Sequence, residues 1–195
     1  MAAATGRTKT PPRVGGAKRS GGRTRELLLA AGVAVAERDG LAGLSVNRVV
    51  TEAGVAKGTF YVHFADRESF VDALHERFHE RVSAAVEQAT AGVPAGAERL
   101  WRAVEAYLDV CLRERGIKAL SLEARTEGAL TASMSARHER FARAAVPSFK
   151  AMGWPDAKAA AQLLAAMTSE IAIRELEARR RLPAARRSLR RFLGL

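Results

Sequence analysis

The sequence predicts an all-α fold on three observations. Apolar side chains recur at the 3.6-residue spacing of helices across most of the chain from Thr24 onward. No stretch shows the alternation of period two that is typical of strands. Glycine and proline interrupt the helical stretches where helices would end and begin. The predicted helices cover residues 24–39, 46–53, 57–63, 67–91, 95–115, 117–126, 131–152, 156–181 and 184–193.

The sequence divides into an N-terminal arm without a helical pattern and two groups of predicted helices. Residues 1–23 are rich in glycine, proline, threonine and cations, so we expect a disordered basic arm. Residues 24–66 hold three short helices, and residues 67–195 hold longer ones that predict a helical bundle. Pro147 lies inside one of the longer helices and is expected to kink or split it.

Basic side chains concentrate at the two ends of the chain. The 195 residues carry a formal net charge of +11. Residues 1–25 and 178–195 each hold seven basic side chains and no acidic one, which leaves the body of the chain nearly neutral. This distribution favours a polyanionic partner, an anionic surface or a role in solubility. The C-terminal arginines are expected to form a solvated face, with attraction to DNA as the alternative.

Cysteine content and hydropathy point to a cytoplasmic protein with no membrane partner. Cys111 is the only cysteine, so no disulfide can form within the chain. The longest apolar run, residues 27–36, is too short to span a bilayer and contains a glycine. The basic N-terminal segment lacks the apolar stretch of a signal peptide.

Residues 45–64, "SVNRVVTEAGVAKGTFYVHF", predict two helices joined by a sharp turn. Ser45 occupies an N-cap position, where its hydroxyl can accept a hydrogen bond from a free backbone amide. Gly54 tolerates a positive φ and ends the first helix. On the second helix Ala56, Phe60 and Phe64 share one face that neighbouring helices can cover.

The opposite face of the second helix has the chemistry of a DNA reader. Lys57 can neutralise a phosphate, and Tyr61 and His63 can donate hydrogen bonds to backbone oxygens. Thr59 can reach a base edge, and Val62 can pack on a thymine methyl in the major groove. This arrangement predicts a helix-turn-helix. On spacing alone, the alternative is a packing helix pair with an incidental polar face.

Residues 25–78 resemble the DNA-binding domain of the tetracycline-repressor (TetR) family of bacterial regulators. The resemblance rests on "AGVAKGTFYVHF" at 53–64, on "DRESF" at 66–70 and on a preceding helix closed by Gly40. It implies DNA contacts from Asn47 as well as the second helix, and a phosphate contact from Arg67. The full predicted DNA-binding set is Ser45, Asn47, Lys57, Gly58, Thr59, Tyr61, Val62, His63 and Arg67.

A competing motif lies at residues 75–79, "HERFH". It matches the H-E-x-x-H pattern in which two histidines bind zinc and a glutamate acts as base. The extended signature would need glycine at Val82 and histidine at Ala85, so it is incomplete. A metal-dependent hydrolase using His75, Glu76 and His79 is therefore the weaker hypothesis, and we expect no enzyme activity, cofactor or metal.

The C-terminal half is expected to bind a small-molecule effector and a second copy of the chain. Bulky side chains there can line an effector cavity or belong to the core. Those assigned to the cavity are Trp101, Tyr107, Met134, His138, Phe141, Phe149 and Trp154. The resemblance implies a homodimer whose interface is built from helices 156–181 and 184–193, and a repressor that binds a palindromic operator. A non-specific binder of nucleic acid or anionic surfaces, driven by the basic ends, is a further alternative.

Overall fold

The computed structural model describes the backbone of residues 15–117 and 131–195, and the side chains of 22–40, 43–117 and 139–195. Within these ranges the chain contains helices and turns but no strand, which confirms the predicted all-α fold. The helices are α1 (Gly15–Gly43), α2 (Val46–Ala53), α3 (Lys57–His63), α4 (Arg67–Thr90), α5 (Ala97–Arg113), α7 (Thr131–Ala151), α8 (Ala157–Ala178) and α9 (Pro183–Phe192).

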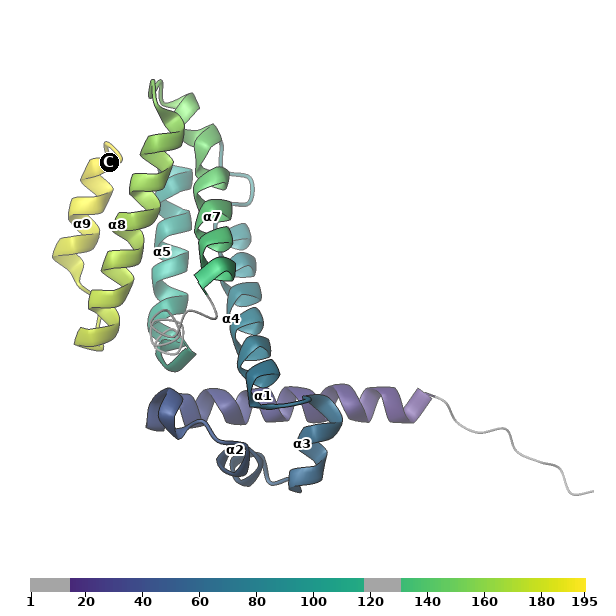
Figure 1. Ribbon diagram of the computed structural model, residues 1–195. Coiled ribbons are helices and arrows are strands. Elements are labelled where there is room, and N and C mark those ends of the chain that lie inside the picture. The colour runs from purple at the N-terminus through teal and green to yellow at the C-terminus, as the bar shows by residue number, and fades with distance from the viewer. Residues whose placement is uncertain (1–14, 118–130) are drawn as a thin grey trace, which may run out of the picture.

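The helices form a small N-terminal unit below a longer bundle (Figure 1). Helix α1 lies across the lower end of the bundle, with α2 and α3 beneath it. Helix α4 leaves this unit and runs upward beside α5, and α7, α8 and α9 complete the bundle. The second and third helices therefore lie at one end of the molecule, away from the bundle.

Helix boundaries in the N-terminal unit match the sequence closely except at the beginning. Helices α2 and α3 begin and end at the predicted residues. Helix α1 begins at Gly15, so the prediction of a disordered arm is wrong for residues 15–23, which are helical. Gly40, with φ of 66°, interrupts α1 near its predicted end. Residues 1–14 lie outside the described part, as does most of the helix predicted at 117–126.

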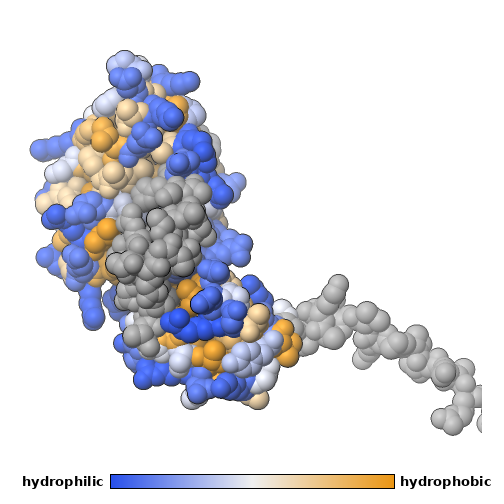
Figure 2. Space-filling model, in the orientation of Figure 1, coloured by the Kyte–Doolittle hydropathy of each residue, from blue (hydrophilic) through white to orange (hydrophobic). Residues whose placement is uncertain are grey.

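The bundle differs from expectation at one proline. Helix α7 continues through Pro147 to Ala151, so the expected split does not occur. No helix in the described part of the chain combines the length and the apolar character that crossing a membrane requires. On the face shown in Figure 2, hydrophobic side chains are scattered among hydrophilic ones.

One of the C-terminal arginines is buried, contrary to the expectation of a solvated arginine face. Arg186 on α9 donates two hydrogen bonds to the carboxylate of Glu175 on α8, at 2.7 and 2.6 Å. A third, of 2.7 Å, goes to Asp109 on α5. Burial disfavours the charged guanidinium, but the hydrogen bonds that Arg186 donates to Glu175 and Asp109 outweigh it and raise the pKa of Arg186. The cluster therefore joins three helices.

Candidate nucleic-acid interface

The first helix of the predicted pair has a defined beginning and end. The Ser45 hydroxyl accepts a hydrogen bond from the backbone amide of Arg48 at 3.4 Å, which caps α2 as predicted. Gly54 ends the helix in the left-handed conformation, with φ of 66° and ψ of 32°. Between these residues Val49 and Val50 are buried against α1. The two ends of α2 thus determine where α3 can begin.

Helix α3 is held in place by an aromatic cluster behind it. The ring of Phe60 lies 5.4 Å from that of Phe64 and 5.2 Å from that of Phe70 on α4, measured between centroids. Phe64 and Phe70 are 4.9 Å apart, in an edge-to-face arrangement. The Arg25 guanidinium of α1 lies 5.2 Å from the Phe64 centroid, within cation–π range. A seven-residue helix would not persist alone in water, so these contacts stabilise it.

The outward face of α3 is open to solvent. Tyr61 is 51% exposed and Val62 is 79% exposed, although both follow the fully buried Phe60. Lys57 is also exposed, whereas Thr59 and His63 are half-buried. A polyanion can therefore approach the helix without any rearrangement of the chain.

Ala56 does not share the buried face of Phe60 and Phe64. It stands at the N-cap of α3 with an extended backbone, and it is exposed. Its side chain makes no capping hydrogen bond, because alanine has no polar group. The inward face of the helix consequently begins at Phe60.

Three predicted DNA-binding residues, Ser45, Asn47 and Arg67, lie outside α3. Asn47 is exposed on α2, one residue before the amide that Ser45 caps. Arg67, the first residue of α4, is exposed and its Nε donates a hydrogen bond to the carbonyl of Leu44 at 2.7 Å. Arg67 thus ties α4 to the turn before α2, a structural role that the sequence did not indicate.

A charged network beside α2 was not anticipated from the sequence. Asp39 near the end of α1 pairs with Arg48 at 2.8 Å, and Arg38 pairs with Glu52 at 3.1 Å. These side chains, together with Asn47, surround a shallow hollow of about 350 Å³. The network joins α1 to α2 at the end where Asn47 is exposed. Neighbouring opposite charges on two predicted helices were the only signal available for it.

Helix α4 begins at a capping box, a reciprocal pair of hydrogen bonds between Asp66 and Ser69, directly after α3. The Asp66 carboxylate accepts a hydrogen bond of 2.7 Å from the Ser69 amide, and the Ser69 hydroxyl accepts one of 3.2 Å from the Asp66 amide. The hydrogen bond from the Ser69 amide lowers the pKa of Asp66, because it favours the ionised carboxylate. This cap determines where the chain turns from α3 into the bundle.

The described residues that were predicted to line an effector cavity lie in the core or pack in aromatic pairs. Trp101 and Phe149 are buried in the core. The Tyr107 ring packs on that of Phe141, with centroids 5.8 Å apart, and Phe149 packs on Trp154 at 5.3 Å. The side chains of two further members lie outside the described residues; these are Met134 and His138.

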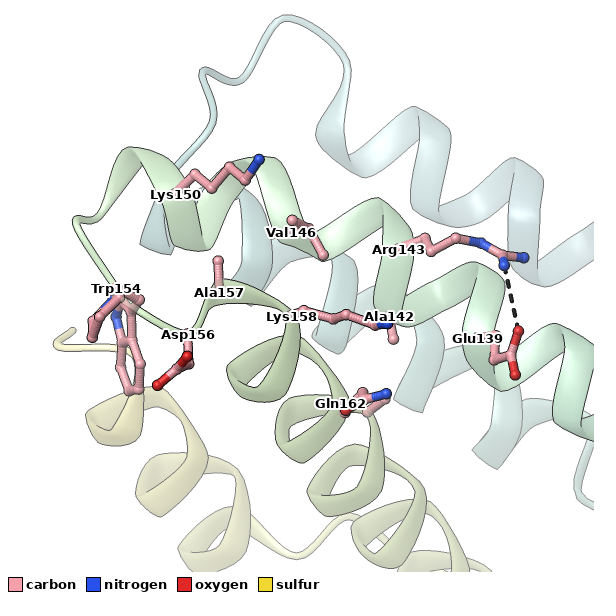
Figure 3. Close-up of a pocket in the computed structure, with 12 residues that line it drawn as sticks. Glu139, Ala142, Arg143, Val146, Lys150, Trp154, Asp156, Ala157, Lys158 and Gln162 are labelled. Atoms are coloured by element: carbon pink, nitrogen blue, oxygen red, sulfur yellow. Dashed lines mark hydrogen bonds and ion pairs between the residues drawn. The ribbon is translucent and has the colours of Figure 1, made fainter.

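A groove lies between α7 and α8, and Trp154 is the one residue of the predicted effector set that lines it among those whose side chains are described. Its volume is about 940 Å³, and Trp154 lies at one end, beside Asp156. Arg143 and Glu139 form an ion pair of 3.4 Å at the other end (Figure 3). Lys150 also lines the groove. Small apolar side chains and charged side chains line the groove in equal numbers, which no aromatic pattern in the sequence could reveal.

The H-E-x-x-H residues have no surroundings typical of a metal site. His75 is buried in the core, and His79 is half-buried with its ring 5.1 Å from that of Phe78. Glu76 is exposed. In the described ranges no three histidine, cysteine, aspartate or glutamate side chains are grouped so that they could hold a metal ion. The two histidines belong to α4, which packs His75 into the protein interior.

Comparisons with known proteins agree with this geometry. The chain superposes on a transcriptional regulator from Rhodococcus sp. RHA1 with a TM-score of 0.76 and 23% identity, covering 87% of this chain and 94% of that one. For the regulatory protein TetR from Rhodobacter sphaeroides the TM-score is 0.71 at 22% identity, covering 88% and 97%. For the multidrug binding protein EbrR complexed with imidazole it is 0.65 at 23%, covering 89% and 91%.

These solved structures share the fold of this chain over 87–89% of its length. The N-terminal unit matches more specifically, because residues 28–74 fit the family model of bacterial regulatory proteins of the tetR family. The matched range contains α2, α3 and the reciprocal cap of α4. Residues 28–74 therefore match the tetR family of bacterial regulatory proteins, and the fold that accompanies them is the fold of these solved structures.

Proposed function

We propose that this protein is a homodimeric, ligand-responsive repressor that binds a palindromic operator in double-stranded DNA. The observation that carries the proposal is the exposed face of α3, where Lys57, Tyr61 and Val62 are open to solvent on a helix supported from behind. In this proposal residues 24–66 are the DNA-binding domain, and residues 67–195 bind the effector and the second copy.

The exposed face supplies both kinds of contact that sequence-specific binding needs. Lys57 and Tyr61 provide phosphate contacts, which position the helix on the duplex. Val62 provides an apolar surface for a thymine methyl in the major groove, and Thr59 a hydroxyl for a base edge. His63, half-buried at the end of α3, and Asn47, exposed on α2, add backbone contacts.

The proposed dimer interface lies on α8 and α9. Leu163 on α8 is 58% exposed, an unusual position for a large aliphatic side chain. Met167, one turn further along, is half-buried. A two-fold dimer through this face would present two copies of α3 to the two halves of a palindrome. One copy alone would read only half of such a site.

The regulatory step is a shift between two arrangements of the reading helices. An effector that binds one arrangement more tightly lowers the population of the other. Helix α4 connects the two parts of the molecule, so a tilt of α4 would move α3 off the operator spacing. The α7–α8 groove supports the proposal of a small-molecule site in the bundle, and EbrR shows that a protein of this fold binds small molecules.

Titration of a duplex selected from genomic DNA tests the proposal. The Lys57→Ala/Tyr61→Ala double variant should lose at least about tenfold in affinity, because phosphate contacts supply much of the binding free energy. Arg102→Ala, which removes an exposed cation from α5, is the control and should bind like the wild type. Wild-type affinity in the double variant would show that DNA is read by another surface.

A further inference from the structure

A short helical turn at residues 115–117, directly after α5 and Glu114, touches the backbone of α1. Gly116 is buried, and a Cβ atom placed on it would lie 2.6 Å from the backbone nitrogen of Glu37 and 2.8 Å from its Cα. Real Cβ contacts are longer than this, and backbone atoms cannot move aside as the end of a flexible side chain can. Only glycine permits this approach of the bundle to the N-terminal unit.

The turn itself is anchored to the bundle on both sides of Gly116. The Glu114 carboxylate pairs with Arg81 of α4 at 2.6 Å, and the Glu114 side chain is only 16% exposed. Ile117 is buried in the core. Because these two residues hold the turn in place, Gly116 meets α1 as a part of the bundle.

The touched segment of α1 is linked in turn to α2. Arg38 and Asp39 directly follow Glu37, and they pair with Glu52 and Arg48 of α2. Val49 and Val50 of α2 also pack against the α1 core. A displacement of α1 at Glu37 would therefore carry α2 with it, and α3 follows through the turn at 54–56.

We propose that the contact between Gly116 and Glu37 is a steric joint that sets the orientation of α2 and α3 relative to the bundle. In a two-fold dimer this orientation determines the distance between the two reading helices, and so the preferred spacing of half-sites. The joint acts on α1, whereas the chain connection from the bundle to α3 runs through α4, to which the turn is also anchored by Arg81. This inference rests on the DNA-binding function proposed above, and it adds a second path by which the bundle controls DNA binding.

The test compares Gly116→Ala with the wild type on duplexes that carry the selected half-sites at different spacings. The added methyl pushes α1 away from the bundle without changing any residue of the reading face. We expect affinity at the wild-type spacing to fall by about tenfold, within the usual range of coupling between sites. The preferred half-site sequence should stay the same while the preferred spacing changes. Gly22→Ala is the control, because no atom lies within 4 Å of a Cβ there.

The joint is disproved if folded Gly116→Ala keeps both the affinity and the preferred spacing of the wild type. If that variant does not fold, Glu114→Ala decides, because it removes the acceptor for Arg81 and leaves Gly116 in place. A broader tolerance of spacing in Glu114→Ala supports the joint, and an unchanged spacing profile overturns it. Failure of the proposed function itself would look different, since the wild type would then show no preferred duplex at all.

Discussion

Arg186 and Glu175 form a two-point ion pair in the interior of the bundle, with N–O distances of 2.7 and 2.6 Å. The Arg186 side chain is 8% exposed and that of Glu175 is 1% exposed. The backbone amide of Leu182 also donates to the Glu175 carboxylate at 2.8 Å, so the carboxylate holds both the turn before α9 and the helix itself. This pair determines how α9 lies on α8.

Removing one partner of that pair should destabilise the protein strongly. Arg186→Met leaves the Glu175 carboxylate buried with its main cation missing, and we expect the free energy of unfolding to fall by about 3–5 kcal/mol. Arg187→Met removes the exposed neighbouring arginine and should change it by no more than about 0.5 kcal/mol. Urea unfolding of both variants measures the difference. Equal stability of the two would mean that the ion pair contributes little.

The adjacent residues Phe60 and Tyr61 should separate stability from DNA binding. Phe60→Ala leaves a cavity in the aromatic cluster and should lower the free energy of unfolding by about 3–5 kcal/mol. Tyr61→Ala removes a half-exposed ring and should cost less than about 1.5 kcal/mol, while it weakens DNA binding. Thermal unfolding and duplex titration of the same samples give both quantities. Tyr61→Ala that unfolds as readily as Phe60→Ala would contradict the assignment of its ring to the surface.

Acid should weaken the cap of α4 in a way that depends on Asp66. Because the folded pKa of Asp66 lies below its ordinary value of 3.8, ionised Asp66 stabilises the folded state above that pH. The contribution is lost as the pH falls through the lowered pKa. Asp66→Asn can still accept the Ser69 hydrogen bond but does not titrate, so its melting temperature should fall less than that of the wild type between pH 5 and pH 2. Asp156→Asn, whose carboxylate makes no capping hydrogen bond, is the control and should follow the wild type.

A substitution of Leu163 should test whether the α8 face forms the proposed dimer interface. A glutamate at this position places a charge in the centre of the α8 face, where two copies would meet, and we expect Leu163→Glu to be a monomer by sedimentation. Leu27→Glu introduces the same charge at a 47% exposed leucine of α1 and should leave the oligomeric state unchanged. A dimeric Leu163→Glu would place the interface on another surface of the molecule.

The first fourteen residues should add affinity without adding specificity. This segment carries Arg7, Lys9 and Arg13 and no acidic side chain. Its deletion leaves α1 intact. The slope of log K against log [salt] for DNA binding should become smaller by the release of about three counterions. The preferred duplex should not change. Complete loss of binding would instead favour a non-specific binder driven by the basic end.

Local signals in the sequence were enough to predict the helices near the reading face. Ser45 and Gly54 define the ends of α2 through hydrogen bonds and backbone geometry that involve only nearby residues. The buried positions of Phe60 and Phe64 follow from their spacing on one helix face. The start of α1 was not predicted, because residues 15–23 are rich in glycine and cations and lack the apolar spacing that marks the rest of the helix.

Contacts between distant segments could not be predicted in this way. Arg186 and Asp109 are 77 positions apart, and nothing in a run of arginines shows which one turns inward. The aromatic residues of the bundle were grouped by type, but packing distributes them among separate pairs such as Tyr107 with Phe141. Gly116 has no pattern around it, because its role depends on the backbone of a helix 79 positions earlier.

The aromatic support behind α3 has a thermodynamic consequence. Phe60, Phe64 and Phe70 order the helix before any partner arrives, so association need not supply the entropy of folding it. The heat capacity change of complex formation should then reflect only the apolar surface that is covered, chiefly around Val62 and Tyr61, and should be small for a protein of this size.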